Sequence, residues 1–228
     1  MDMINPFGFP ILVEVLPDGD KLADEFVELA RSIRSSEENG GLMSEAWHDA
    51  EVATSSKQYK DHGYTSFVNH NLCLNSDFDN IHKATVSQKE KYLHMMGVDY
   101  EFYIQNSWAS IYGNGHFIPE HIHSFSHLSM VFYAAATKGT GDIIFRNPSY
   151  AHYGMIFDQK SRIFNDQFRI GPEKGMMIIF PSFIPHYTRP HNDEAERVIF
   201  SSNSVFKNSP LSNEFKVAGG TDHVKDDS

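Results

Sequence analysis

The chain has 228 residues, 40% of them hydrophobic and 21% charged, which suits one domain (1–228) with a core of its own. Its formal net charge of −11 argues against binding to nucleic acid, because proteins that bind phosphate backbones present clustered Lys and Arg. A lone cysteine, Cys73, and apolar runs far shorter than the roughly 18 residues that span a bilayer predict a cytoplasmic protein without membrane contact.

The first 99 residues are predicted to form a mainly helical N-terminal part. Residues 9–16 have the composition of a short edge strand. Behind Asp18 and Asp20, either of which can cap a helix start, apolar residues recur at helical spacing. These residues are Leu22, Phe26, Leu29 and Ile33. Residues 35–65 are polar and rich in Gly and Ser, which predicts a long loop, and residues 77–96 predict a second helix.

From residue 100 onward, short apolar segments alternate with turn signals. The predicted strands are residues 102–112, 128–136, 142–145, 176–180 and 198–206. Several short strands at this spacing favour an antiparallel jelly roll. We therefore predict a mainly β fold of the α+β class, in which a double-stranded β-helix (jelly roll) over residues 100–206 has the N-terminal helices packed on it. Residues 219–228 are predicted to form a flexible tail.

Three histidines form the main candidate site. His121 and His123 are separated by one residue, and in extended backbone residues i and i+2 point to the same face, so both imidazoles can reach one ion. His186 follows the apolar strand that ends near residue 180, and strands of a jelly roll that are distant in sequence can lie side by side. We predict that these three side chains bind a metal. The alternative for a His-x-His pair alone is a pair of exposed loop histidines.

Arg197 is the candidate partner of an anionic co-substrate. Strand alternation places Arg197 and every second residue up to Asn203 on one face. A charge at the start of an inward face is unfavourable unless it meets an anion, and a guanidinium matches a carboxylate in two-point contact. A dicarboxylate could thus chelate the metal with one end and meet Arg197 with the other. The alternative is a surface arginine that pairs with Glu194 or Glu196.

Together, these motifs resemble the 2-oxoglutarate/Fe(II) oxygenase superfamily, and in particular a group of largely uncharacterised bacterial and phage members. The resemblance covers roughly residues 100–206. It rests on Trp108, His121-Ile122-His123, Leu128-Ser129, Tyr133, Gly141–Phe145, Asn147-Pro148, Gly175, Phe180-Pro181-Ser182, His186, Arg197 and Asn203. It implies a non-haem dioxygenase or hydroxylase that uses Fe(II) and the co-substrate 2-oxoglutarate to oxidise a C–H bond of a small-molecule or peptide substrate.

Two positions depart from the pattern of the superfamily. A carboxylate is expected at position 123, where a histidine stands, and a serine or threonine is often found where Ile199 stands. Three neutral imidazoles leave a +2 ion uncompensated, although iron dioxygenases with three histidines exist. Glu120 could supply the missing carboxylate, but adjacent strand positions face opposite ways.

Other functions of the same architecture remain open. The spacing from Gly115 to His123 and from Gly175 to His186 partly matches cupins, although His127 and Ala134 replace the expected glutamate and glycine. A zinc site for hydration or hydrolysis also uses such histidines, but it does not require Arg197. A jelly roll with a degenerate site that binds a sugar or peptide without chemistry is the third alternative.

Secondary candidates lie near the predicted site. Tyr112 and Ser129 are on predicted strands that flank it and are candidates for hydrogen bonds to 2-oxoglutarate; the alternative is an ordinary role in lining the core. Trp108 is expected in the core rather than as a substrate platform. His127 has the best claim to a place beside the metal ligands, ahead of His116 and His191. The loop 40–65 is a candidate lid, and an aromatic-rich sandwich surface can support a homodimer.

Overall fold

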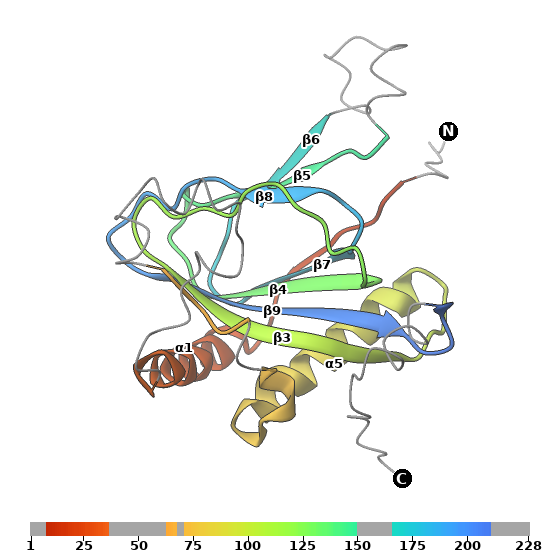
Figure 1. Cartoon of the computed structure of the whole chain (residues 1–228), viewed down its shortest axis with the longest axis horizontal. Coiled ribbons are helices and arrows are strands. Elements are labelled where there is room, and N and C mark those ends of the chain that lie inside the picture. Colours follow the sequence, from red (N-terminus) through yellow and green to blue (C-terminus); the bar gives the residue numbers. More distant parts are fainter. Residues whose placement is uncertain (1–7, 37–62, 68–70, 150–165, 211–228) are drawn as a thin grey trace.

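The computed structural model describes residues 8–36, 63–67, 71–149 and 166–210. Within them, two antiparallel sheets face each other, and two helices cover the outer face of the larger sheet (Figure 1). The candidate lid, except for its last residues, and the C-terminal tail lie outside the described residues. None of the described helices is long and apolar enough to cross a membrane.

Six strands form the larger sheet, and three form the smaller one. The order in the larger sheet is β1 (Leu12–Val15), β7 (Met176–Pro181), β4 (Leu128–Ala135), β9 (Arg197–Phe206), β3 (Phe102–Tyr112) and β2 (Tyr64–Thr65). The order in the smaller sheet is β6 (Gln167–Ile170), β5 (Ile143–Arg146) and β8 (His186–Thr188). Neighbours that are distant in sequence, such as β4 and β9, therefore lie side by side, as expected for a jelly roll.

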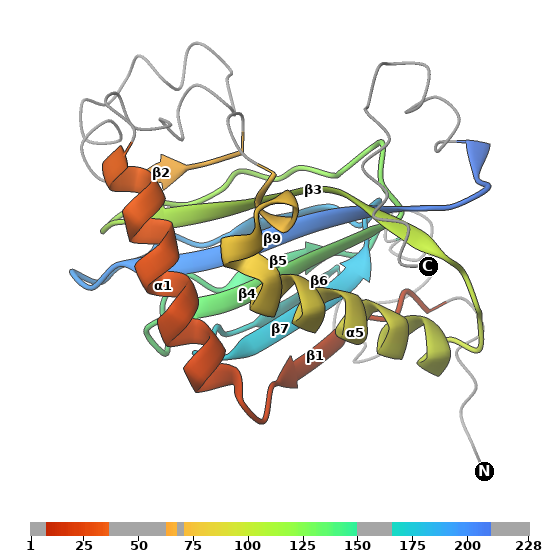
Figure 2. The same cartoon turned by 90° about the horizontal axis from the view of Figure 1, so that it is seen from below.

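The two helices are α1 (Gly19–Ser36) and α5 (Asp79–Met95), and Figure 2 shows both against the larger sheet. Short 3-10 turns, η1 (Leu72–Leu74) and η2 (Ser76–Phe78), precede α5. The apolar stripe of α1 is buried because it meets the sheet: the ring centroid of Phe26 lies 5.4 Å from that of Phe200 on β9 and 5.9 Å from that of Phe78. The helices thus fix one face of β9 from outside.

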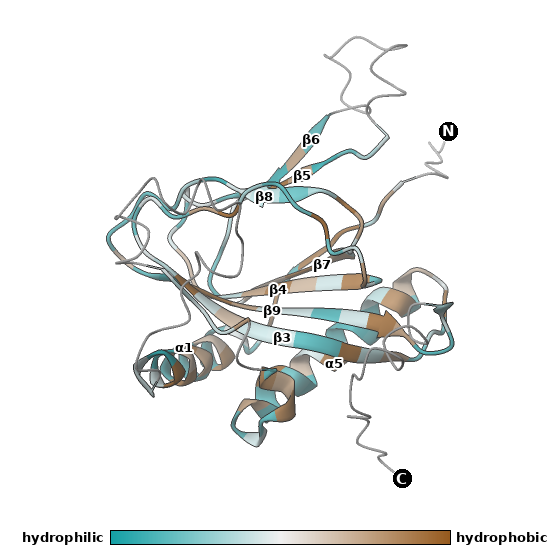
Figure 3. Cartoon of the chain, viewed as in Figure 1, coloured by the Kyte–Doolittle hydropathy of each residue, from teal (hydrophilic) through white to brown (hydrophobic). Residues whose placement is uncertain are grey.

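Alternation along the central strands gives the molecule two core layers. On β4, Met130 and Phe132 pack toward the helices, whereas Val131 and Tyr133 pack between the two sheets. Strands β4 and β7 carry hydrophobic segments in the middle of the molecule (Figure 3). The site described below lies between the two sheets, with residues on the inner face of β9 in the larger sheet and at the start of β8 in the smaller one.

The predicted mainly β fold with N-terminal helices packed on it is confirmed. The edge strand, both helices and the five predicted strands are present, with ends shifted by two residues or fewer in the five strands. The prediction of a loop over residues 35–65 is wrong at its end, because Tyr64 and Thr65 form β2 by pairing with Ile111 and Ser110 of β3. Strands β6 and β8 were not predicted from the sequence.

Candidate functional site

The three candidate histidines converge. Their possible ligand atoms all lie within 4.8 Å of one another. The convergence follows from backbone pairing, because His121 and His186 form an antiparallel bridge in which each backbone N–H donates to the other's carbonyl at 3.0 Å. One step along, the backbone N–H of His123 donates to the carbonyl of Ser182 at 3.0 Å. An extended segment that carries the His-x-His pair therefore runs beside the segment that leads into His186.

Backbone carbonyls fix the ring orientation of two of the histidines. Nδ1 of His121 lies 2.8 Å from the carbonyl oxygen of Pro119, and Nδ1 of His186 lies 2.9 Å from that of Ile184. A carbonyl oxygen can only accept, so Nδ1 carries the proton in both rings. Nε2 of each neutral ring then carries a lone pair instead of a proton, which is the form that binds a metal.

The site keeps its imidazoles neutral. Burial, with the neighbouring ring of His121, lowers the pKa of His123 to about 3. Burial likewise lowers the pKa of His121, although its bond to the carbonyl of Pro119 opposes the shift. Burial and the other two rings hold the pKa of His186 well below its usual range. Neutral imidazoles do not have to lose a proton before they bind a cation.

Three aromatic side chains lie beside the histidine cluster. The ring centroid of Phe180 lies 4.7 Å from that of His186, and Phe145, which is opposite His186 in the β5–β8 register, lies 6.0 Å from it. Trp108 lies 6.3 Å from His123 and stands edge-on to Phe67 at 4.8 Å. Trp108 is buried, as expected for a core residue, and its indole also borders the cluster.

His123 is held by a side-chain network instead of a carbonyl. The side-chain amide of Asn203 lies beside it, with Nδ2 at 3.3 Å from His123 Nδ1. The hydroxyl of Ser129 donates to Asn203 Oδ1 at 2.8 Å and shares a hydrogen bond of 2.9 Å with the hydroxyl of Ser182. All three of these partners are at most 3% exposed. The predicted candidate Ser129 thus lies near the site, but its described hydrogen bonds go to Asn203 and Ser182.

Arg197 is buried at the start of β9, with 1% of the residue exposed. Its Nη1 donates to the carbonyl of Gly141 at 2.7 Å, and its Cζ lies 4.1 Å from the ring centroid of Tyr112, its register partner on β3. Nε and Nη2 have no hydrogen-bond partner among the residues that the structure describes. A buried guanidinium with open donors is a ready partner for a carboxylate.

Gly141 makes room for this guanidinium. Its φ of +67° favours glycine, and a Cβ at this position would overlap Arg197 Nη1 and lie 3.0 Å from Cζ. The sequence indicated Gly141 only as part of the resemblance to the oxygenase superfamily, and it did not indicate the contact between Gly141 and Arg197. The burial of Tyr112 raises the pKa of its hydroxyl, and the nearby charge of Arg197 opposes that rise.

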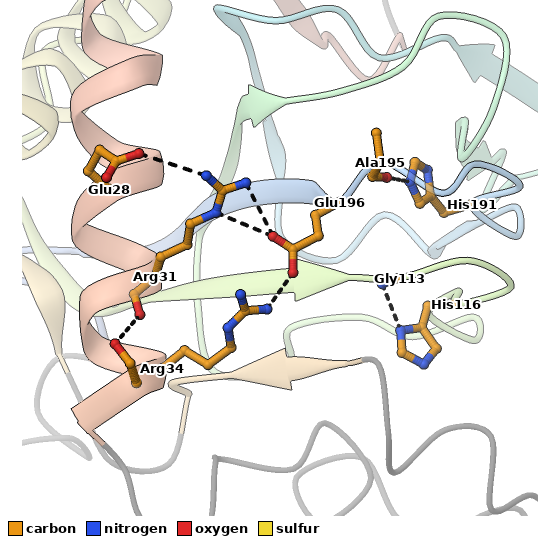
Figure 4. Close-up of polar contacts among 9 residues, drawn as sticks. Glu28, Arg31, Arg34, Gly113, His116, His191, Ala195 and Glu196 are labelled. Atoms are coloured by element: carbon orange, nitrogen blue, oxygen red, sulfur yellow. Dashed lines mark hydrogen bonds and ion pairs between the residues drawn. The ribbon is translucent and has the colours of Figure 1, made fainter.

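The alternative of a surface arginine paired with Glu194 or Glu196 is excluded, because Arg197 is buried and both carboxylates are engaged elsewhere. Glu196 accepts from Arg34 at 2.6 Å and from Arg31 at 3.3 Å, which ties the start of β9 to α1 (Figure 4). Burial of the Glu196 carboxyl opposes ionisation, but the two arginines outweigh it and lower its pKa. Glu194 accepts from Asn114 at 2.7 Å.

The remaining candidates lie apart from the cluster. Glu120 pairs with Arg146, in agreement with the expectation that it faces away. His127 stacks on Phe206 with ring centroids 4.5 Å apart, and its Nδ1 accepts from the backbone N–H of that residue. The histidines at 116 and 191 are both buried: Nδ1 of the first accepts from the backbone N–H of residue 113, and Nε2 of the second donates to the carbonyl of residue 195 (Figure 4).

Residues 106–203 match the protein family described as "Putative 2OG-Fe(II) oxygenase". This segment contains the three histidines, Arg197 and Asn203. Over this segment, the match confirms the resemblance to the 2-oxoglutarate/Fe(II) oxygenase superfamily, and it supports an oxygenase, hence an oxidoreductase. No curated protein matches the chain.

Solved structures share the fold at low sequence identity. A prolyl-4-hydroxylase from Pseudomonas putida is 14% identical, with a TM-score of 0.53 over 88% of this chain and 94% of that protein. HygX from Streptomyces hygroscopicus, solved with nickel and 2-oxoglutarate, is 10% identical, with a TM-score of 0.51 over 88% and 84%. The epimerase SnoN, in complex with Fe3+, alpha ketoglutarate and nogalamycin RO, is 12% identical, with a TM-score of 0.52 over 86% and 79%. These likenesses establish the fold alone.

Proposed function

We propose that the chain is a non-haem Fe(II)- and 2-oxoglutarate-dependent dioxygenase that oxidises a C–H bond of a small-molecule or peptide substrate. One observation carries the proposal. A cluster of three neutral imidazoles and a buried guanidinium with open donors lie within a segment that matches an oxygenase family, the first around His186 of the smaller sheet and the second on β9 of the larger sheet. Fe(II) would use the imidazole cluster, and a dicarboxylate bound to it would use the guanidinium, so this pair of ligands accounts for both features.

The donor set suits the metal. His121, His123 and His186 would hold Fe(II) through neutral imidazole nitrogens, a ligand type that suits iron, and three protein ligands leave coordination positions open. When bound, iron would supply the oxidative decarboxylation of 2-oxoglutarate and the oxidation of the substrate C–H bond. The nearby rings of Phe145 and Phe180 would limit the access of water to the site.

Arg197 would bind the distal carboxylate of 2-oxoglutarate. Burial makes an uncompensated guanidinium unfavourable, and an arginine cannot lose its proton to escape that penalty. Gly141 takes only Nη1, so Nε and Nη2 remain for an anion. Tyr112 would hold the guanidinium plane against its ring, and its hydroxyl is a further candidate contact to the co-substrate, as is Ser129.

Strand β9 connects the two ends of this proposed site. Arg197 and Asn203, which contacts His123, are six residues apart, a backbone distance of about 20 Å in an extended strand. By alternation, Ile199 and Ser201 face inward between them. A five-carbon dicarboxylate is much shorter than this backbone distance, so it would meet both ends only because the side chains of Arg197 and His123 and the bound metal extend toward it along the inner face of the strand.

Turnover of 2-oxoglutarate tests the proposal. The full chain is reconstituted with Fe(II) without oxygen, then given oxygen and 2-oxoglutarate, and succinate is measured; uncoupled turnover without substrate suffices. We expect succinate from the native chain and none from His186→Ala. A matched control is His127→Ala, because His127 is a histidine outside the cluster and its substitution leaves turnover intact. No succinate above the metal-free background would overturn the proposal.

The same samples separate the alternatives. A zinc hydrolase, or a cupin-like protein with zinc, would retain zinc in elemental analysis and would not respond to 2-oxoglutarate. A binding jelly roll without chemistry would keep its ligand after His186→Ala. A cytoplasmic location, a single domain and a homodimer stay predictions from the sequence.

A further inference from the structure

The three candidate ligands differ in what holds their Nδ1 atoms. Carbonyl oxygens hold His121 and His186, and a carbonyl can bond only to a protonated Nδ1. The partner of His123 is the side-chain amide of Asn203, which has a donor at one end and an acceptor at the other. His123 is therefore the one ring of the cluster whose tautomer depends on how its partner is turned.

The two orientations of this amide have opposite consequences for metal binding. With Nδ2 facing His123, the amide donates to a lone pair on Nδ1, and the proton of the neutral ring is on Nε2, which then cannot bind a cation. With Oδ1 facing His123, the amide accepts from Nδ1–H, and Nε2 keeps a lone pair, as in His121 and His186. Only the second orientation gives three equivalent Nε2 ligands.

The surrounding hydroxyls can support either orientation. In the first, the hydroxyl of Ser129 donates to Asn203 Oδ1. After a half-turn of the amide, Nδ2 donates to the same hydroxyl, and Ser129 donates onward to Ser182 across their 2.9 Å contact, in which either oxygen can be the donor. No hydrogen bond is lost, and the ends of an amide have nearly the same shape, so the turn needs no extra space.

We propose that Asn203 is a positioning residue of the metal site: with its carbonyl oxygen facing Nδ1–H of His123, and Ser129 and Ser182 completing the network, it holds His123 in the tautomer that binds the metal through Nε2. The inference rests on the proposed function, because it takes the three histidines as the ligands. Burial strengthens it, since Asn203 is 3% exposed and Ser182 is fully buried, which leaves water little access as a substitute partner.

Metal affinity in matched variants tests this role. Fe(II) binding to the full chain is measured by equilibrium dialysis without oxygen for the native protein, Asn203→Leu and Asn203→Asp. Leucine has a similar size but no hydrogen bond, so we expect an affinity roughly 10- to 100-fold lower. Aspartate accepts from Nδ1–H and from Ser129, and it adds a negative charge near an uncompensated +2 ion. We expect it to restore or exceed the native affinity.

Two further variants exclude a merely structural explanation. Asn106 lies opposite Asn203 in the β3–β9 register and has no hydrogen bond to the three histidines among the described contacts, so Asn106→Leu is the matched control, with native affinity expected. Ser129→Ala acts one bond further from His123 and should weaken binding by less than Asn203→Leu does. If the role of Asn203 were packing alone, a buried aspartate would be at least as harmful as leucine.

The tautomer itself gives a readout that needs no metal. Nitrogen NMR of the histidine rings in the metal-free chain distinguishes a proton on Nδ1 from one on Nε2, with His123 assigned through His123→Gln. We expect the Nδ1–H form of His123 to dominate in Asn203→Asp and to decline in Asn203→Leu. Native iron affinity in Asn203→Leu, or failure of Asn203→Asp to restore it, would overturn the role of Asn203 and leave the metal site standing. Absence of iron binding in the native chain would overturn both.

Discussion

Strand β9 has a buried cation against each face, and the two cations are treated differently. On the outer face, Lys89 of α5 is fully buried and its ammonium meets three oxygens: the carbonyl and hydroxyl of Ser202 at 3.4 and 3.0 Å, and the hydroxyl of Ser204 at 2.7 Å. On the inner face, Arg197 is equally buried but donates to one described acceptor, the carbonyl of Gly141. The two cations are equally buried, but Lys89 has more hydrogen-bond acceptors than Arg197 among the described residues.

The two groups also differ in whether they can discard their charge. Burial lowers the pKa of Lys89 to about 7, so this side chain can lose its proton and become neutral near neutral pH. A guanidinium, in contrast, is not deprotonated in proteins, so arginine has no such way to become neutral. A buried charge is therefore not by itself a sign of function. A buried charge is a sign of function when the group can neither lose its charge nor donate to enough acceptors of the protein, because a ligand must then supply the missing acceptors.

The largest expected effect separates these two cations directly. Arg197→Gln removes the proposed charge-assisted contact to 2-oxoglutarate and should weaken the binding of 2-oxoglutarate by on the order of 100-fold or more. Lys89→Met, on the opposite face of the same strand, should leave that affinity within about twofold, since the two sites share no partner. Calorimetric titration of 2-oxoglutarate into the metal-loaded chain without oxygen measures both. Equal losses in the two variants would contradict the distinction.

A smaller effect is expected from the glycine that accommodates the guanidinium. In Gly141→Ala the new Cβ overlaps Arg197 Nη1, which must move away from its acceptor, so the affinity for 2-oxoglutarate should fall by roughly 10-fold. Gly139 has a φ of +89° and open space around its Cβ position. Gly139→Ala therefore introduces backbone strain without the overlap. A similar loss of affinity in both variants would assign the effect to the loop conformation instead of the guanidinium.

The pH dependence of stability reports on Lys89. Its pKa is about 7 in the folded chain and about 10.4 when unfolded, so between these values the unfolded chain binds a proton that the folded chain does not. The free energy of unfolding should therefore rise as the pH increases from 7 to 10, by up to about 1.4 kcal/mol per pH unit. When the free energy of unfolding is measured by urea unfolding at several pH values, it should rise less steeply with pH in Lys89→Met than in the native chain. Lys91→Met, at an exposed position on the same helix, should retain the native slope.

The convergence of the three histidines could be anticipated from the sequence in part, because the spacing of His121 and His123 is local and the fold class that brings His186 beside them could be predicted. The i, i+2 spacing of His121 and His123 and the position of His186 after a strand require only extended backbone and a jelly roll. The alternation from Arg197 to Asn203 is likewise a property of one strand. The contact between Asn203 and His123 joins residues 80 positions apart, and it depends on how β9 sits against the segment that follows β3. No periodicity contains that information.

The sequence failed to predict two strands for a different reason. Strands β6 and β8 have four and three residues, and only the last residue of β6 and the first of β8 are buried. They exist because they pair with β5, not because their own composition requires it. The same applies to the two residues of β2. Gly141 was recognised as part of a motif, but its contact with a side chain 56 residues away comes from tertiary structure.

The smallest expected effect distinguishes the contribution of the Tyr112 ring from that of its hydroxyl. Tyr112→Phe keeps the ring 4.1 Å from the Arg197 guanidinium and should lower the affinity for 2-oxoglutarate by less than about threefold, whereas Tyr112→Leu removes the ring and should lower it by about 3- to 10-fold. Both affinities follow from the same calorimetric titration, with melting curves to exclude unfolding. If phenylalanine weakens binding as much as leucine does, the hydroxyl contacts the co-substrate, and Tyr112 is a ligand-binding residue rather than a support for Arg197.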